Sequence, residues 1–100
     1  MSLQVMNYTF EGPYASANDL KEMSGVYLIV GNNGGDRWNV VDVGESGGVK
    51  SRVGNHDRAM CWRGQNYTNL QVAVLYANEN QRMAIEQQLR QNFNPPCGER

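Results

Sequence analysis

Four side chains in this sequence have types that could do chemistry together if the fold brought them to one place. Arg52 and His56 are four residues apart, so on a helix they would share one face. A guanidinium matches phosphate oxygens with a planar fork of donors, and an imidazole with a pKa near roughly 6.5 can carry a proton. Tyr27 lies in an apolar run, and Glu86 offers the kind of oxygen ligand that Mg²⁺ prefers.

Two strands are the first elements needed to position these side chains. Residues 25–30 are rich in β-branched and aromatic side chains, which is typical of a strand. Residues 31–36 are dense in turn formers, and a second strand is predicted over residues 38–43. Because the connection between them is short and polar, we expect an antiparallel hairpin.

A helix is predicted directly after this hairpin, over residues 49–56. Val49 and Val53 would pack on the sheet, because they recur at helical spacing. Arg52 and His56 lie beside them, so the helix would place a cation and an imidazole at the rim of the sheet.

A third strand and a final helix complete the predicted core. Residues 70–76 alternate in the manner of a strand, and Asn78 or Asn80 can cap the helix that follows. The apolar stripe of this helix recurs at every fourth position: Ile85, Leu89 and Phe93. Residues 94–96 end the helix, because proline disfavours helical geometry in the residue before it. Glu86 lies near the edge of the stripe, from which it could reach the same rim.

The N-terminal part of the chain shows a weaker pattern. Residues 1–15 are predicted to be irregular, apart from one short strand within residues 5–10. Ser16 or Asn18 can cap a short helix that follows. The predicted order is therefore strand, strand, helix, strand, helix, with mainly antiparallel pairing.

The composition predicts one folded domain over residues 1–100 and argues against a disordered or coiled-coil chain. The apolar run at residues 26–30 is far too short to span a bilayer, so we expect no membrane partner. We see no signal peptide and expect a cytoplasmic location. The formal net charge is −1, but acidic residues concentrate in the first half and basic residues in the second. A basic face can therefore form, and phosphate binding should be weak and salt-sensitive.

The two cysteines, Cys61 and Cys97, are too few for a disulfide scaffold. Without a secretion signal, the expectation is two reduced thiols. A zinc site is not expected, because His56 is the only histidine and the two cysteines lack zinc-ligand spacing.

In this order and spacing, the motifs resemble those of the GIY-YIG nuclease family. Residues 25–27 match the GIY element, and residues 42–44 fall where the YIG element belongs. Further positions follow at the family's spacing: Ser46, Val49, Arg52, His56, then Glu86 with Leu89, and Pro95-Pro96. The resemblance covers about residues 24–98.

The resemblance implies a small α/β (α+β) sandwich with a three-stranded, mainly antiparallel sheet flanked by helices. It implies an endonuclease that hydrolyses DNA with one Mg²⁺ or Mn²⁺ ion held by Glu86. Tyr27 would be the general base or would position the water, Arg52 would bind phosphate, and His56 would assist proton movement. Further residues are assigned to substrate binding: Lys50, Arg58, Gly44 and Ser46. Gly44 is also expected to permit a backbone turn or a close approach.

Two positions depart from the family pattern. Asp42 replaces the second tyrosine of the motif, and two hypotheses follow: a weak base, or a second carboxylate near the metal. Gly98 stands where the family usually has an asparagine, and Asn94 is a substitute at a different spacing. These departures leave two alternative functions open: a nucleic-acid-binding module that has lost turnover, and a protein-interaction domain. Specificity would come from substrate structure, from a partner protein or from a homodimer.

Overall fold

The sheet is organised around β3 (Gly25–Asn32), whose residues are all buried. The computed structural model describes residues 1–98. Strand β3 pairs antiparallel with β4 (Asn39–Ser46) on one side and with β5 (Asn69–Tyr76) on the other. The antiparallel hairpin and the third strand are therefore as predicted, although the second strand of the hairpin continues to Ser46 instead of ending at Val43.

The sheet has five strands in the order β1-β2-β5-β3-β4, which corrects the three predicted. The additional pair is a hairpin of β1 (Ser2–Val5) and β2 (Tyr8–Tyr14), in a region predicted to be largely irregular. Phe10 is fully buried in this hairpin, and Met6 adopts a positive φ of 55° at its turn. The strands were hard to predict because exposed polar residues interrupt their short apolar pattern.

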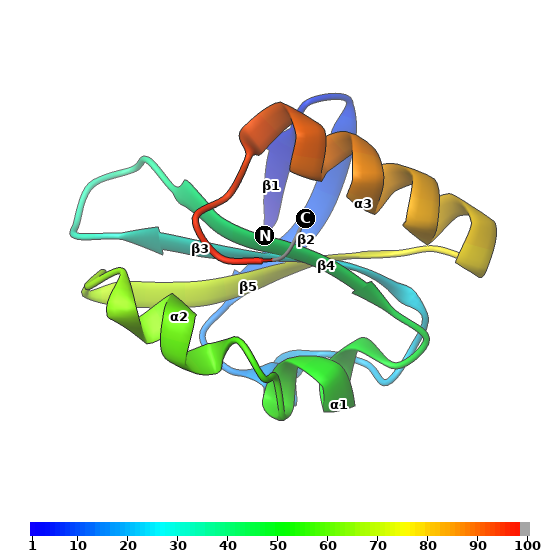
Figure 1. Ribbon diagram of the computed structural model, residues 1–100, viewed down its shortest axis with the longest axis horizontal. Coiled ribbons are helices and arrows are strands. Elements are labelled where there is room, and N and C mark those ends of the chain that lie inside the picture. The colour runs from blue at the N-terminus through cyan, green and yellow to red at the C-terminus, as the bar shows by residue number, and fades with distance from the viewer. Residues whose placement is uncertain (99–100) are drawn as a thin grey trace.

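Helices cover both faces of the sheet (Figure 1). A 3-10 turn, η1 (Ala17–Asp19), and the helices α1 (Val49–Gly54) and α2 (Ala59–Gly64) lie on one face. The long helix α3 (Glu79–Phe93) lies on the other. Within residues 1–98, no helix is long and apolar enough to cross a membrane.

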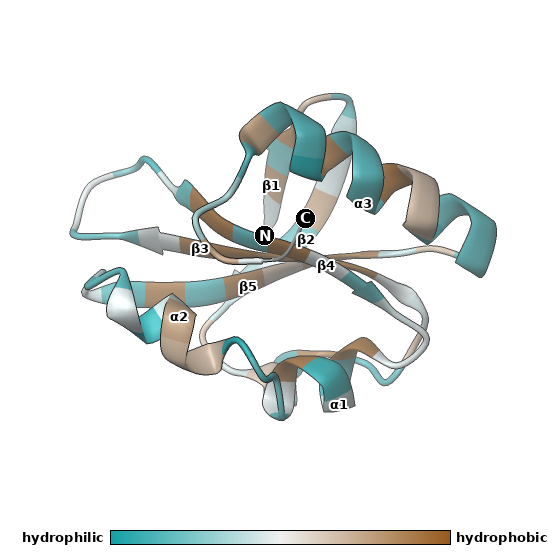
Figure 2. Ribbon diagram, in the orientation of Figure 1, coloured by the Kyte–Doolittle hydropathy of each residue, from teal (hydrophilic) through white to brown (hydrophobic). Residues whose placement is uncertain are grey.

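Alternating side chains of β3 supply both halves of the core. Tyr27 and Ile29 belong to the cluster packed under α1 and α2. Val26, Leu28 and Val30 belong to the cluster packed under α3. Figure 2 shows the hydrophobic positions of β3 and β5 at the centre of the molecule. Tyr27 therefore points toward the face where α1 packs.

The two longer predicted helices are present, whereas the short helix predicted after Ser16 is only a 3-10 turn. The helix predicted over residues 49–56 ends at Gly54, and α2 follows as a separate short helix. His56 therefore lies beyond α1, so the expected helix face shared by Arg52 and His56 does not form. Ser16 caps η1 by accepting a hydrogen bond from the Asn18 amide. Asn78 caps α3 in a reciprocal capping box with Gln81, and α3 ends before the prolines, as predicted.

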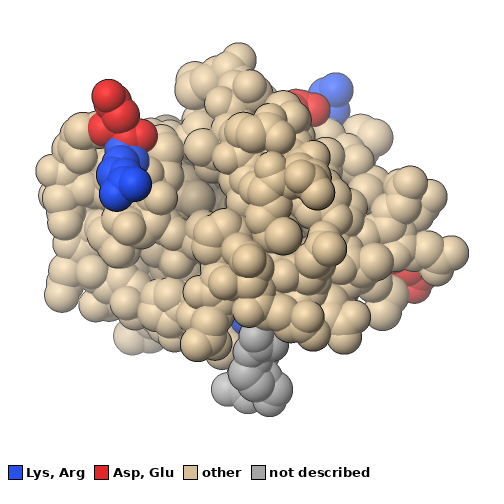
Figure 3. Space-filling model, turned by 90° about the horizontal axis from the view of Figure 1, so that it is seen from above, with Lys and Arg blue, Asp and Glu red and all other residues tan. Residues whose placement is uncertain are grey.

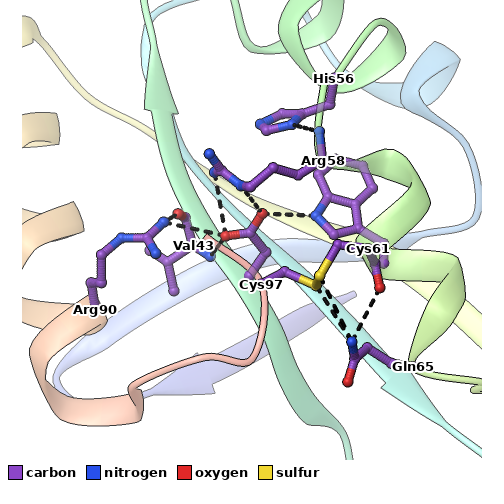
Figure 4. The surroundings of a disulfide bond; sticks show 9 residues. Val43, His56, Arg58, Cys61, Gln65, Arg90 and Cys97 are labelled. Atoms are coloured by element: carbon purple, nitrogen blue, oxygen red, sulfur yellow. Dashed lines mark hydrogen bonds and ion pairs between the residues drawn. A yellow bond between two sulfur atoms is a disulfide. The ribbon is translucent and has the colours of Figure 1, made fainter. Parts of the chain in front are cut away.

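Cys61 and Cys97 form a disulfide bond, so the expectation of two reduced thiols was wrong (Figure 4). The bond joins α2 to the segment that follows α3, and Cys97 is fully buried. The Cys97 amide also donates to the Val41 carbonyl at 3.1 Å, which seats this segment against β4. The cysteines are 36 positions apart, so only the path of the chain after α3 brings them together.

Candidate active site

A polar cleft of about 200 Å³ opens where α1, α3 and the segment before α2 meet β4. Seven residues line it: Tyr27, Gly44, Glu45, Arg52, Arg58, Glu86 and Arg90. Three of the four side chains singled out first, Tyr27, Arg52 and Glu86, therefore share one cleft. The fourth, His56, is buried directly behind Tyr27.

Gly44 lets Tyr27 reach the cleft. The two residues are direct cross-strand partners, and the phenol lies over the glycine. A Cβ atom at position 44 would fall 2.2 Å from the phenolic oxygen and from Cζ. The close approach expected at this glycine is thus present, and it is the approach of a side chain to the backbone.

Tyr27 and His56 form a buried hydrogen bond, with 2.5 Å between Oη and Nε2. The other ring nitrogen, Nδ1, accepts a hydrogen bond of 3.0 Å from the backbone N–H of Arg58. The Asp57 carboxylate also lies 3.2 Å from Nδ1 but makes no hydrogen bond with it. Because a backbone amide can only donate, we assign Nδ1 as the unprotonated nitrogen of the neutral ring and Nε2 as the donor to Tyr27. The hydroxyl hydrogen of Tyr27 then takes no part in the hydrogen bond with His56. The His56 ring also packs on Trp62, with centroids 4.7 Å apart.

Burial shifts the pKa values of this pair in opposite directions. Loss of solvent raises the pKa of Tyr27 to about 12, against the opposing effect of Arg52 and Arg58. Loss of solvent, followed by the same two cations, lowers the pKa of His56 to about 4. Both groups are therefore uncharged at neutral pH.

Arg52 lines the cleft from α1 and is partly exposed. Its Nη2 pairs with Asp57 at 3.0 Å, and the Asp57 side chain is 72% exposed. An ion pair this open to water contributes little free energy, so Arg52 can exchange Asp57 for a phosphate oxygen at small cost. The face of the molecule seen in Figure 3 shows a few scattered charged side chains among the described residues, some of them acidic and basic side by side.

Glu86 lies on α3 with its Oε2 2.9 Å from Arg90 Nε. Its side chain is 23% exposed at the cleft, and no described contact engages its Oε1. Glu45 also lines the cleft and pairs with Arg82 at 2.6 Å. Glu45 was not among the predicted site residues, although it directly follows Gly44 in the motif.

The donor set fits a hard divalent cation that keeps most of its water. Within residues 1–98, no group of three or more histidine, cysteine, aspartate or glutamate side chains is placed to hold a metal. Mg²⁺ needs no such cage, because one carboxylate, waters and substrate phosphates complete its coordination. Glu86, with one uncommitted oxygen at an open polar cleft, meets that requirement.

Asp42 lies outside the cleft, and its position argues against both hypotheses made for it. The side chain is fully buried. Donors surround both of its oxygens: the Val43 amide, Arg58, Trp62 and Arg90. A carboxylate enclosed in this way has no lone pair directed at a substrate or at a metal in the cleft.

The remaining predicted residues divide between the cleft wall and other positions. Arg58 lines the cleft, whereas Lys50 is exposed on α1 outside its lining. Ser46 accepts a hydrogen bond of 3.0 Å from the Gly48 amide, so it shapes the loop before α1. Asn94 caps the end of α3 with a φ of 47° and does not line the cleft. Gly98 has a φ of 121°, and a Cβ there would fall 2.1 Å from Arg90 Nη1.

Comparison with solved structures shows that the chain has a GIY-YIG-like fold. The resemblance predicted from the motifs is thus confirmed at the level of the fold. No family model matches the chain, and no curated protein does.

The similar solved structures are three point mutants of the GIY-YIG N-terminal endonuclease domain of UvrC from Thermotoga maritima, each bound to its catalytic divalent cation. Each has a TM-score of 0.60 and covers 84% of this chain and 91% of that domain. The sequence identities are 19%, 22% and 18%.

Proposed function

We propose that this protein is an endonuclease that hydrolyses DNA phosphodiester bonds with one divalent cation, Mg²⁺ or Mn²⁺. The observation that carries the proposal is the shared cleft of Tyr27, Arg52 and Glu86, with His56 bonded behind the phenol. The fold it shares with a cation-bound endonuclease domain supports the same function.

In this proposal each side chain has a distinct task. Glu86 would hold the cation, which when bound supplies charge neutralisation for the phosphate and the leaving oxygen. Arg52 binds and orients the phosphate through two donors. The Tyr27 oxygen accepts the His56 Nε2 proton in a hydrogen bond, which stabilises the oxygen as negative charge develops on it.

The resting pKa of Tyr27, about 12, means that few molecules carry a phenolate at neutral pH. Arg52 and Arg58 already lower this pKa, so additional positive charge in the cleft would lower it further. Tyr27 would therefore act as the phenolate: its phenolic proton would first pass to hydroxide in the solvent, and the phenolate would then accept the proton of the attacking water, which restores the phenol. Because the phenolate fraction of Tyr27 grows as the pH rises toward its pKa, we expect the cleavage rate to rise with pH through the neutral range.

The alternative of a DNA-binding module without turnover also has a specific observation in its favour. Glu86 is already neutralised by Arg90 at 2.9 Å, so a cation must compete with an existing ion pair. If the pair persists, the cleft would still bind phosphate through Arg52 and Arg58. For either function, we propose that a homodimer or a partner protein supplies sequence specificity, because phosphate contacts carry no sequence information.

The test is cleavage of supercoiled plasmid and branched DNA in Mg²⁺ or Mn²⁺. Tyr27→Phe should reduce nicking on the order of 10²- to 10⁴-fold, because it removes the group that handles the proton. Tyr67→Phe is the matched control, since Tyr67 is a partly buried tyrosine outside the cleft. Nicking that survives both Tyr27→Phe and Glu86→Ala would point to a contaminant and contradict the proposal. Salt-sensitive binding without nicking would favour the binding module.

A further inference from the structure

Asp42 connects the cleft residues although it does not reach the cleft itself. The pairing of β3 with β4 shifts at this point: Ile29 pairs with Asp42 and Val30 with Val40. Val41 is therefore an extra residue in β4, and such irregularities commonly redirect side chains. The Asp42 carboxylate sits fully buried at the edge strand of the sheet, where groups from both faces can meet it.

The first group that meets it is Arg58, from the α2 side. Arg58 Nε lies 2.7 Å from Asp42 Oδ2, and its Nη2 lies 3.3 Å from Oδ1. The Arg58 side chain is 22% exposed, and it lines the cleft. No described contact engages its Nη1. Arg58 is therefore held by one edge of its guanidinium while donors on the other edge are available to a ligand.

The second group is Arg90, which reaches around the edge of the sheet from α3. Its Nη2 lies 3.2 Å from Asp42 Oδ1 and also donates to the Val43 carbonyl. Its Nε lies 2.9 Å from Glu86 Oε2. One guanidinium thus joins Asp42 to the carboxylate of the cleft. Figure 4 shows Arg58 and Arg90 approaching the same carboxylate from opposite sides.

The third group is Trp62, whose Nε1 donates to Asp42 Oδ2 at 2.7 Å. Trp62 packs on His56, which is the hydrogen-bond partner of Tyr27. Asp42 is therefore connected to three cleft residues. It contacts Arg58 directly, and it contacts Glu86 through Arg90. It is connected to Tyr27 through Trp62 and His56.

We propose that Asp42 is a positioning residue that fixes Arg58 in the cleft wall as a second phosphate-binding cation and holds Arg90 against Glu86. The phosphate-binding part of this role rests on the proposed function. The Asp42 carboxylate pairs with both guanidinium groups, and Glu86 balances the second charge, so the four groups together are neutral. Arg58 would therefore attract an anionic ligand through the donors that Asp42 leaves unengaged, and not through an excess of charge. In this chain, the departure from tyrosine at position 42 would thus provide an anchor instead of a reacting group.

The anchoring is tested without any activity measurement, by NMR of arginine Nε–H groups. In the wild-type protein, the Arg58 and Arg90 Nε–H signals should be resolved and slow to exchange with water. Asp42→Asn should make the Arg58 signal exchange at least about tenfold faster, because that N–H loses its charged acceptor. Asp36→Asn, an equal change of charge in the exposed loop after β3, should leave both signals unchanged. A rapidly exchanging, mobile Arg58 in the wild type would overturn the proposal even if Asp42→Asn failed to fold.

The phosphate role is tested by the salt dependence of binding to a short DNA duplex without metal. Arg58→Gln should weaken binding and lower the slope of log affinity against log salt by about one. Asp42→Asn should lower the slope in the same way, and the double variant should bind no more weakly than Arg58→Gln alone. A wild-type slope in Asp42→Asn, or additive losses in the double variant, would overturn the proposal. If the wild-type protein binds DNA with this pattern but never cuts it, the proposed endonuclease activity is contradicted while the role of Asp42 is supported.

Discussion

The hydrogen bond between Tyr27 and His56 shows how one backbone amide can set the chemistry of a side-chain pair. The Arg58 amide occupies His56 Nδ1, so the ring presents its Nε2 proton to the phenol. In this arrangement the imidazole supports negative charge on Tyr27 and cannot remove its proton. In the proposed nuclease the phenolate of Tyr27 would accept the proton of the attacking water, and His56 would support that phenolate.

The pKa of His56 predicts that the protein loses stability on mild acidification. Its folded-state pKa of about 4 is below the ordinary histidine pKa of 6.5, so the unfolded chain binds a proton more readily. The contribution, roughly 3 kcal/mol, is fully present above pH 6.5 and is lost as the pH falls toward 4. Denaturant unfolding at several pH values measures it, and His56→Gln should flatten the dependence in this window. His56 is the only histidine of the sequence, so its NMR titration is unambiguous. A midpoint near 6.5 would contradict the lowered pKa.

Gly44 predicts a second effect at the scale of one residue. Gly44→Ala should displace the Tyr27 ring, because the new Cβ would lie 2.2 Å from its oxygen. We expect a loss of about 1–3 kcal/mol in the free energy of unfolding, together with loss of nicking. Gly47→Ala is the matched control, since nothing lies within 4 Å of a Cβ at that position. Equal behaviour of the two variants in thermal unfolding would show that the phenol does not need the glycine.

Among the helices and strands, those with a strong local sequence pattern were predicted, and those with a weak local pattern were not. The apolar run of β3 and the capped, proline-ended helix α3 carry their information within a few neighbouring residues. The short helix α2 has no side-chain cap, and Trp62, its one buried residue, packs in the core cluster with side chains of the sheet. The hairpin of β1 and β2 likewise depends on pairing with β5, far away in the sequence. Such long-range partners override local preference.

The capping box of α3 predicts a measurable contribution to stability. Asn78 accepts from the Gln81 amide at 2.9 Å, so Asn78→Ala leaves that N–H without its partner. We expect a loss of about 1 kcal/mol in the free energy of unfolding. Asn80→Ala, two residues along the same helix, should be neutral or slightly stabilising because alanine favours helix. Urea unfolding of both variants makes the comparison, and an Asn78→Ala variant as stable as Asn80→Ala would rule out the cap.

At the scale of the whole molecule, the spacing of the motif predicted several residues that line the cleft. It did not predict the hydrogen-bond partners that hold those residues in place. Tyr27, Arg52 and Glu86 meet because β3, α1 and α3 converge at the edge formed by β4. The enclosure of Asp42 could not be predicted, because its donors come from α3 and from the chain around α2. No spacing in the sequence reports those contacts.

The disulfide predicts that reduction weakens the whole domain. It closes a loop across 36 positions, for which chain entropy gives roughly 4 kcal/mol. Thermal unfolding with and without dithiothreitol should therefore show a lower midpoint in the reduced protein. The double variant Cys61→Ser/Cys97→Ser should unfold at the lower temperature in both conditions. Since a cytoplasmic location, expected from the sequence, would favour the reduced form, activity should be measured in both states.

If Glu86 holds a divalent cation beside the Tyr27 phenol, as we propose, DNA cleavage must depend on metal through this side chain. Single-turnover rates would be measured across a Mg²⁺ titration for the wild type, Glu86→Gln and Glu79→Gln, an exposed glutamate on the same helix. We predict saturable, chelator-sensitive cleavage by the wild type and Glu79→Gln, and a loss of at least about 100-fold in Glu86→Gln. Cleavage by Glu86→Gln at the wild-type rate and metal dependence would contradict the account.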